Sequence, residues 1–288
     1  MKKFYYVDTG HRVGLDRFRR AVAILNALKD DEITLLCSDF RIAHEARNLG
    51  VKNSVGIDLV RNIVNIAHRG DKLIFDSAEA NPLMLEDMRA YFSTFIRVSD
   101  DADDKRAENE FLISAYYEDK LTCKAVMVDD KYFGSFDKTI EIGFFFGDDD
   151  YEKDLEKHFD FLNGLDVAFL CGFYYFFDYE EMLKKRFKKS YEFEDYDDFI
   201  TSSKILLSSS PQAVLENLAS GGKPIYFQRA DYTDDFIKLF ESLNIPIIYN
   251  FDKEKLDEVL AGILSHNYNK LRQNSDKVVN YLKDKLYL

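Results

Sequence analysis

The residues with the clearest chemical potential lie in a turn that follows the first apolar segment of the chain. Residues 4–7 are apolar, and Asp8 and His11 come after them, before a helix that begins near Gly14 and carries Arg17 in its first turn. Backbone N–H groups at the start of a helix, together with cations, can bind an anion. The alternative interpretation is an ordinary strand–helix turn whose charged side chains face water.

A second polar turn follows the apolar residues 205–207. It contains three consecutive serines: Ser208, Ser209 and Ser210. Pro211 comes next and suits the first position of a helix, because its missing N–H would have no partner there. Serine hydroxyls and N–H groups at this point can cradle a pyrophosphate, and Glu216 further along the helix could reach the hydroxyl pair of a ribose. The alternative is a well-capped helix with a glutamate on its surface.

A third turn begins at Gly147, after another apolar segment. It continues with three acidic residues: Asp148, Asp149 and Asp150. Carboxylates of this kind are typical Mg²⁺ ligands, but they also cap a helix and interact favourably with its dipole. The capping interpretation is the simpler one, so we expect neither a metal ion nor a cofactor.

The overall composition excludes several classes of partner. The chain has 288 residues and a net charge of −13, which argues against nucleic-acid binding and against adhesion to anionic lipid. Its three cysteines are far apart, so we expect buried thiols in a reducing compartment rather than disulfides: Cys37, Cys123 and Cys171. The N-terminus does not resemble a signal peptide, and no apolar run reaches the ~18 residues of a membrane-spanning helix. We therefore expect a cytoplasmic protein.

Strand-like and helix-like segments alternate along the chain, which indicates parallel sheets in the α/β class. The predicted strands are residues 4–7, 33–37, 73–75, 95–98, 125–128, 139–146, 167–170, 205–207, 225–227 and 247–249. The predicted helices are residues 15–28, 40–49, 58–68, 82–91, 150–162, 178–187, 195–202, 211–219, 232–242, 253–264 and 266–284. No strand is followed by the G-x-G-x-x-G pattern of dinucleotide-binding domains, and P-loop and nucleophile-elbow motifs are also missing from the sequence.

The number of predicted strands is too large for one comfortable sheet. The best boundary follows the acidic stretch 99–110 and lies near residues 129–138. It gives an N-terminal Rossmann-like domain over residues 1–135 and a C-terminal one over residues 136–288, each of ordinary domain size. The final helix could pack back on the first domain.

Taken together, the three turns resemble those of GT-B-type nucleotide-sugar proteins, and they are most similar to the UDP-sugar hydrolase family of the pseudaminic acid pathway. In that family the first strand leads into Gly-x-Gly-His-x-x-Arg at a helix start. Gly14 and Arg20 match the first glycine and the final arginine, whereas Asp16 stands in place of the second glycine and Arg17 in place of the catalytic histidine. The turn at Gly147 resembles the start of the family's second domain, and residues 208–216 resemble its UDP-binding loop and helix.

The resemblance implies two Rossmann-like domains whose parallel sheets face a central cleft. On this interpretation the sugar or acceptor lies against the N-terminal domain near Asp8–Arg17, with Gly14 as a substrate-binding residue. UDP would lie on the C-terminal side at Gly147, the three serines and Glu216. It further implies a glycosyltransferase or a UDP-sugar hydrolase of surface-glycan or flagellin-glycan biosynthesis.

The arginine in the position of the catalytic histidine leaves two alternatives for activity. A guanidinium does not accept a proton near neutral pH, so Arg17 could bind phosphate but not activate water. His11 lies in the same turn and could supply the base, oriented by Asp8 or Asp76. The alternative is a catalytically inactive homologue that serves as a binding or scaffold protein, with a protein partner.

Overall fold

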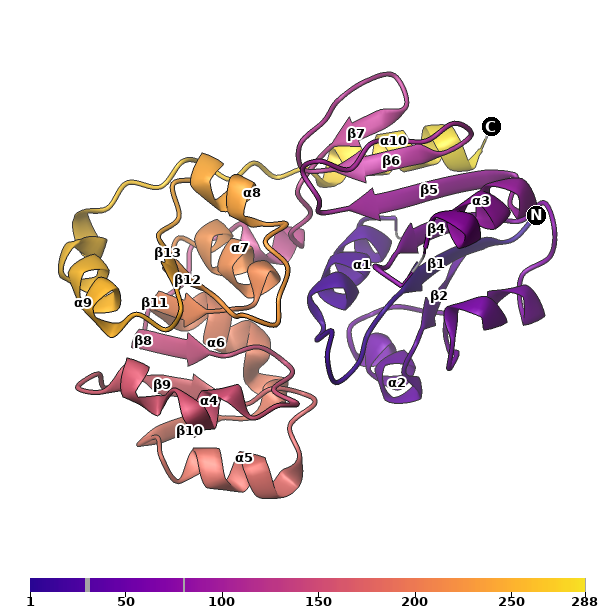
Figure 1. Ribbon diagram of the computed structural model, residues 1–288. Coiled ribbons are helices and arrows are strands. Elements are labelled where there is room, and N and C mark those ends of the chain that lie inside the picture. The colour runs from indigo at the N-terminus through magenta and orange to yellow at the C-terminus, as the bar shows by residue number, and fades with distance from the viewer. Residues whose placement is uncertain (29–31, 80, 288) are drawn as a thin grey trace. The chain divides into compact units, whose positions relative to one another are not determined.

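The computed structural model describes residues 1–28, 32–79 and 81–287. The chain forms two compact units. The first unit consists of Met1–Gly10, Arg17–Asp130 and Gln273–Leu288, and the second of His11–Asp16 and Lys131–Arg272. Each unit contains one parallel β-sheet with helices packed around it (Figure 1).

The sheet of the first unit has the strand order β3-β2-β1-β4-β5-β6-β7. Its strands are β1 (Lys3–Val7), β2 (Ile33–Cys37), β3 (Ser54–Gly56), β4 (Lys72–Asp76), β5 (Thr94–Ser99), β6 (Phe111–Ser114) and β7 (Thr122–Lys124). The helices of this unit are α1 (Asp16–Ala27), α2 (Phe40–Asn48), the 3₁₀ helix η1 (Val60–Asn65), α3 (Pro82–Tyr91) and α10 (Ser275–Leu286). The first residue of α1, Asp16, is assigned to the second unit.

Burial on both faces explains why the central strands of this sheet are continuously apolar. Tyr5, Tyr6 and Val7 of β1 are all fully buried, as expected of a parallel strand covered by helices on both sides. Val7 pairs with Cys37 on one side and with Asp76 on the other. The strand order reverses between β1 and β4, so the residues that follow these two strands lie at a topological switch point.

The sheet of the second unit has the strand order β10-β9-β8-β11-β12-β13. Its strands are β8 (Ile140–Phe145), β9 (Ala168–Leu170), β10 (Lys189–Tyr191), β11 (Ser203–Ser208), β12 (Lys223–Gln228) and β13 (Ile247–Tyr249). Its α-helices are α4 (Asp154–Lys157), α5 (Phe177–Lys184), α6 (Tyr196–Ser202), α7 (Pro211–Ala219), α8 (Ile237–Ser242) and α9 (Lys253–Gly262). The switch point of this sheet lies between β8 and β11.

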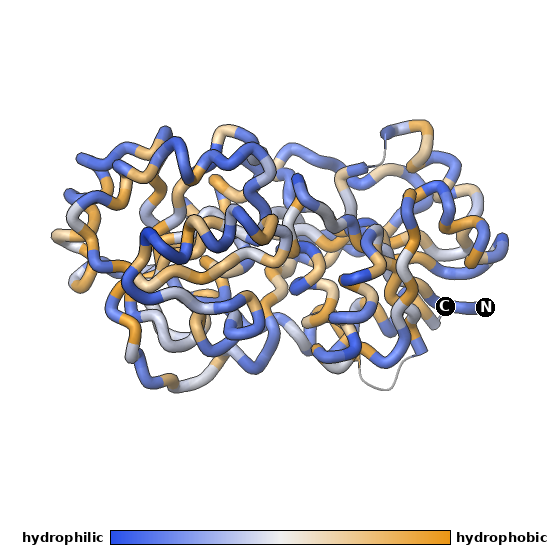
Figure 2. The backbone as a smooth tube through the Cα atoms, turned by 90° about the horizontal axis from the view of Figure 1, so that it is seen from below, coloured by the Kyte–Doolittle hydropathy of each residue, from blue (hydrophilic) through white to orange (hydrophobic). Residues whose placement is uncertain are grey.

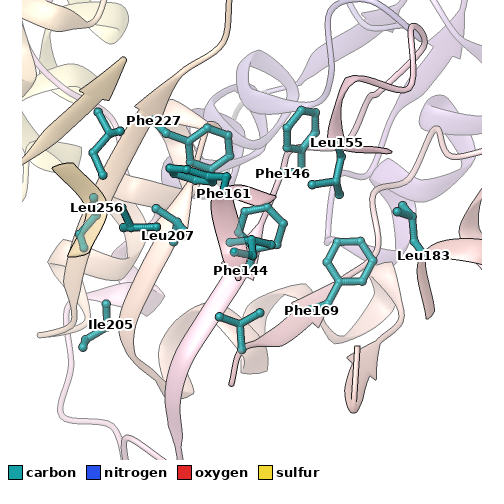
Figure 3. Packing of buried hydrophobic residues seen from close by; sticks show 14 of the residues in the cluster. Phe144, Phe146, Leu155, Phe161, Phe169, Leu183, Ile205, Leu207, Phe227 and Leu256 are labelled. Carbon is teal, nitrogen blue, oxygen red and sulfur yellow. The ribbon is translucent and has the colours of Figure 1, made fainter. Parts of the chain in front are cut away.

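Phenylalanine side chains fill the core of the second unit (Figure 3). The ring of Phe144 on β8 lies 6.1 Å from that of Phe169 and 5.8 Å from that of Phe227, both in stacked arrangements. Phe146 and Phe161 add further contacts with Phe227. Large rings of this kind bury much apolar area and fix their neighbours through their shape. Much of the high phenylalanine content of the chain therefore serves packing.

The predicted α/β class with parallel sheets is confirmed, and most predicted strands are present. Figure 2 shows that hydrophobic and hydrophilic stretches alternate along the backbone. The strand predicted at residues 125–128 is wrong, because the seventh strand is Thr122–Lys124. Ala125 N–H still donates to the Ser114 carbonyl, but the next carbonyl, that of Val126, accepts from the Asn274 side chain. The segment is buried and apolar without continuing the sheet.

The C-terminal helix is shorter than predicted, since it begins at Ser275 rather than at residue 266. The preceding residues are held in the second unit: the Asn269 N–H donates to the Leu243 carbonyl, and the Tyr268 hydroxyl donates to the Pro224 carbonyl. α10 itself belongs to the first unit, where the Tyr281 hydroxyl donates to the Leu121 carbonyl at 2.6 Å. Within the described residues, no helix combines the length and apolar character needed to cross a membrane.

Close packing of β8 against α6 makes Gly143 sensitive to substitution. A Cβ atom at this position would collide with Ser203 Oγ and would lie 3.0 Å from the Phe199 ring. We expect Gly143→Ala to lower the free energy of unfolding by about 1–3 kcal/mol, the usual cost of overpacking. Gly262→Ala, at the end of α9, is the control, because its Cβ would meet no described atom within 4 Å. Urea unfolding of both variants checks this, and equal stabilities would contradict it.

Candidate functional site

Three neighbouring strand ends bring polar residues together at one edge of the sheet in the second unit, and most of these residues are buried. We call this group the strand-end site and define it as residues 147–150 after β8, 208–210 at the end of β11 and 229–232 after β12. β8 and β11 flank the switch point of the sheet. Open α/β sheets bind their ligands at this point, outside the carboxyl ends of the strands. All three predicted serines and Gly147 therefore lie at one edge.

A buried arginine connects two of these strand ends. Arg229 is only 2% exposed, and its Nη1 donates to the Asp149 carbonyl at 2.8 Å. Its Nε and Nη2 donate to the carboxylate of Asp231 at 2.9 and 2.6 Å. The guanidinium also lies 4.5 Å from the centre of the Phe146 ring and 4.3 Å from that of Tyr232. These contacts fix the turn after β8 against the turn after β12.

Asp149 completes this buried network. Its carboxylate accepts from the Tyr232 hydroxyl at 2.5 Å and from Arg229 Nη2 at 3.4 Å. Burial raises the pKa of Asp149 to about 6, although Arg229 and Tyr232 act in the opposite direction by favouring its ionised form. Arg229 and Tyr232 were not predicted as site residues, since no local motif marks them; their position after β12 is their main sequence signal.

The other carboxylates of the acidic turn have structural partners. The Asp150 carboxylate accepts from the backbone N–H groups of Asp154 and Leu155, at 2.7 and 3.1 Å, and from the Tyr179 hydroxyl. Asp150 therefore caps the short helix α4, which supports the capping interpretation. Asp148 is buried, and its carbonyl accepts from the Tyr174 N–H.

Two predicted glycines lie against the network. Gly147 has φ of +125°, and a Cβ there would lie 3.4 Å from Arg229 Nη1. Gly14 has φ of +70°, and a Cβ there would lie 3.0 Å from Asp149 Oδ1. Both positions favour glycine because an L side chain rarely adopts such φ values. The structure thus brings Gly14 and Gly147 together with the strand-end site.

The serines hold the beginning of α7. Ser208 Oγ accepts from the Ser210 N–H at 3.0 Å, and Ser209 Oγ donates to the Phe146 carbonyl. Ser210 is the N-cap: its hydroxyl accepts from the Ala213 N–H at 3.1 Å and donates to the carboxylate of Asp16. The predicted helix with a serine cap and Pro211 in its first turn is confirmed.

Glu216 is more buried than the sequence suggests. It is 1% exposed, and its carboxylate accepts from the Tyr196 hydroxyl at 2.7 Å and from Gln212 Nε2 at 2.9 Å. Gln212 lies one helical turn earlier, a spacing that places two side chains on the same face. Tyr196, from α6, is distant in sequence and could not be found by local reasoning.

His11 belongs to the second unit and lies among aromatic rings. Its imidazole is stacked on Phe176, with ring centres 5.3 Å apart and planes 7° apart, and its centre lies 4.8 Å from that of Tyr174. The neighbouring Arg12 pairs with Glu152 at 2.6 Å and lies 4.1 Å above the ring of Tyr151. The aromatic residues after β8 and β9 were not predicted as site residues.

The remaining predicted residues, Asp8 and Arg17, lie in the first unit at its own switch point. Arg17 Nε lies 3.9 Å from the carboxylate of Asp76, which ends β4. Asp76 is fully buried and accepts from the Tyr5 hydroxyl at 2.9 Å and from Arg20 Nε and Nη2 at 3.0 and 2.6 Å. Arg20 is thus a central member of this cluster, and it also pairs with Asp100.

Asp8 is a carboxylate with altered acidity. Burial raises its pKa to about 6, with a further rise from the nearby charge of Glu79 and an opposing effect of Arg17. Its carboxylate accepts a hydrogen bond from the Ser38 hydroxyl, at 3.4 Å. A carboxyl group with this pKa can exchange protons near neutral pH.

Removing the buried arginine should destabilise the second unit. We expect Arg229→Met to lower the free energy of unfolding by about 3–5 kcal/mol, because it leaves the buried Asp149 without its cation. The double variant Arg229→Met/Asp149→Asn should recover part of the free energy of unfolding that Arg229→Met loses. Lys204→Met is the control, since Lys204 pairs with Glu141 at an exposed position and should cost less than about 1 kcal/mol. Urea unfolding measures all three, and similar costs for both single variants would contradict the assignment.

The raised pKa of Asp8 predicts a specific pH dependence. Between about pH 4 and pH 6 the folded protein retains a proton that the unfolded chain has lost, so this group makes stability fall as pH rises. Asp8→Asn should therefore gain stability relative to the natural chain between pH 4 and pH 7.5, on the order of 2 kcal/mol. The exposed Asp58→Asn is the control. Urea unfolding at both pH values tests this, and a constant offset between variant and natural chain would exclude it.

Comparison with solved structures shows that this fold is of the GT-B type. The UDP-GlcNAc 2-epimerase of Methanocaldococcus jannaschii, in complex with UDP-GlcNAc and UDP, has a TM-score of 0.62 at 11% identity, with 100% of both chains covered. The S. aureus MnaA–UDP co-structure has a TM-score of 0.64 at 12% identity, covering 100% of this chain and 98% of the other. The spinosyn rhamnosyltransferase SpnG, complexed with thymidine diphosphate, has a TM-score of 0.58 at 8% identity, covering 99% and 96%. No protein-family model and no curated protein matches the chain. The predicted fold class, two Rossmann-like domains with parallel sheets, is confirmed by these structures.

Proposed function

We propose that this chain binds a nucleotide sugar, with UDP as the nucleotide, at the strand-end site of the second unit. The observation that carries the proposal is the N-terminus of α7, capped by Ser210, at the switch point between β8 and β11. Helix N-termini in this position favour the phosphates of nucleotides. Solved structures with this fold hold UDP or thymidine diphosphate, which supports the same class of ligand here.

In this proposal the diphosphate contacts the three serines and the backbone at Gly147. A serine hydroxyl can rotate to donate to a phosphate oxygen. Gly14 and Gly147 leave room for the Asp149 carboxylate and the Arg229 guanidinium, respectively, beside this position. Arg229 is engaged by Asp149 and Asp231, so its role in this proposal is to hold the turns after β8 and β12 in place.

The ribose is assigned to Glu216. Its carboxylate lies on the second turn of α7 and is bonded to Tyr196 and Gln212. Binding of a ribose hydroxyl would replace the hydroxyl of Tyr196 with one of the same chemistry. The carboxylate keeps its number of hydrogen bonds in this exchange, and the displaced hydroxyl of the buried Tyr196 must find another acceptor.

The resemblance to the pseudaminic-acid UDP-sugar hydrolases supports a more specific proposal, an enzyme of surface-glycan or flagellin-glycan biosynthesis. His11 would serve as the base, Arg17 as a phosphate ligand and Asp8 as an orienting or proton-exchanging carboxylate. Transfer to a sugar or protein acceptor and transfer to water both fit this set of groups.

The second candidate function is a binding or scaffold protein without catalysis. One observation favours it: Asp76, a proposed orienting group for His11, is buried and already bonded to Arg20 and Tyr5. Such a carboxylate has little remaining capacity to hold an imidazole. A chain of this kind would retain nucleotide-sugar binding without releasing the nucleotide.

Calorimetric titration with UDP, CDP and GDP tests the proposed ligand. We expect UDP to bind with the highest affinity and Glu216→Gln to weaken it by about tenfold, through a lost charge-assisted hydrogen bond to the ribose. Glu141→Gln, an exposed carboxylate near the start of β8, is the matched control and should leave the affinity unchanged.

The same titration separates the candidate functions. No binding of UDP or a UDP-sugar at millimolar concentration would refute the proposal. Binding accompanied by release of the nucleotide from a UDP-sugar would establish an enzyme. Binding without release, also in the presence of sugar acceptors, would favour the scaffold function.

A further inference from the structure

The N-terminus of α7 already has an anionic partner within the chain. The hydroxyl of Ser210, which caps this helix through the Ala213 N–H, donates to the carboxylate of Asp16. Asp16 belongs to the second unit with the rest of residues 11–16. A negative charge is therefore held at the positive end of the α7 dipole, where a phosphate would be favoured.

The contacts of the preceding residues show how Asp16 is held there. Gly14 lies against Asp149 and Tyr232, close enough that an added Cβ would be 3.0 Å from the Asp149 carboxylate. Arg12 is paired with Glu152, and His11 is stacked on Phe176. The segment 11–16 is thus anchored to the same strand ends that form the candidate site.

The charge of Asp16 reaches other groups of the site. Burial is the largest cause of the raised pKa of Tyr226 and of Tyr232, and the charge of Asp16 raises both pKa values further. Tyr232 donates to Asp149 and lies beside Arg229. Asp16 is therefore electrostatically coupled to the turn after β12 as well as to α7.

We propose that Asp16 is an internal competitor for the phosphate position at the N-terminus of α7 and sets the affinity of the strand-end site for phosphate-bearing ligands. The inference rests on the proposed function, because it concerns the same site. A ligand phosphate and the Asp16 carboxylate would require the same hydroxyl donor and would repel each other. A ligand must therefore displace Asp16, and its apparent affinity is reduced by the population in which Asp16 is bound.

The test uses Asp16→Asn, which keeps the size of the side chain and its ability to accept from Ser210 but removes the charge. Inorganic pyrophosphate and UDP are titrated calorimetrically into the full-length natural chain and the variant at pH 7.5 and constant ionic strength. We expect both ligands to bind the variant at least tenfold more tightly. In the natural chain, pyrophosphate should also increase hydrogen exchange in residues 11–16, because Asp16 is released.

Two controls make the result specific. Glu141→Gln removes one negative charge near the other end of β8, so it corrects for the change in net charge. Circular dichroism checks that each variant is folded. If Asp16→Asn does not fold, Asp16→Ser is measured in its place, since serine is also favoured at the start of a helix.

The outcomes distinguish this inference from the proposed function. Equal or weaker binding of both ligands by the variant would overturn the role of Asp16, and if UDP still bound, the proposed function would stand. Tighter pyrophosphate binding by the variant without any UDP binding would support the role of Asp16 and refute the nucleotide function. Binding of neither ligand by either protein would overturn both.

Discussion

The arrangement of the turns after β8 and β12, at the carboxyl edge of the second sheet, depends on one buried guanidinium, that of Arg229. Arg229 is bonded to the backbone and carboxylate of Asp149 on one side and to the carboxylate of Asp231 on the other. A buried charge is tolerated only when such partners compensate for its lost hydration. The compensation requires the turns after β8 and β12 to hold their positions, and the serine turn between them is held by its own bonds, such as that of Ser209 to the Phe146 carbonyl.

The first unit also contains a buried arginine whose charge is compensated by carboxylates at the ends of strands. Arg20, from α1, is bonded to Asp76 at the end of β4 and to Asp100 just after β5. In both sheets a buried arginine thus connects acidic residues at the carboxyl ends of strands. In a parallel sheet the polar turns that follow the strands lie together at this edge. The buried ion pairs fix the position of each turn relative to its neighbours.

The sequence was sufficient for those features that depend on local patterns. Buried parallel strands such as Lys3–Val7 are continuously apolar, and Ser210 before Pro211 marks the start of α7. Edge strands such as Lys189–Tyr191 were missed because they are short and exposed, and residues 125–128 were misassigned because apolar character reports burial rather than pairing. The partners Arg229 and Tyr196 were missed for a different reason: they are fixed by tertiary contacts between residues far apart in the chain.

The division of the chain into two units also determines the order in which they can be completed during synthesis. The chain passes between the units four times, after Gly10, Asp16, Asp130 and Arg272. Residues 11–16 are synthesised before the partners with which they pack in the second unit, whereas α10 is synthesised after the second unit but belongs to the first. Neither unit therefore reaches its final set of contacts as an isolated stretch of nascent chain, and the first unit must wait for the second to be translated.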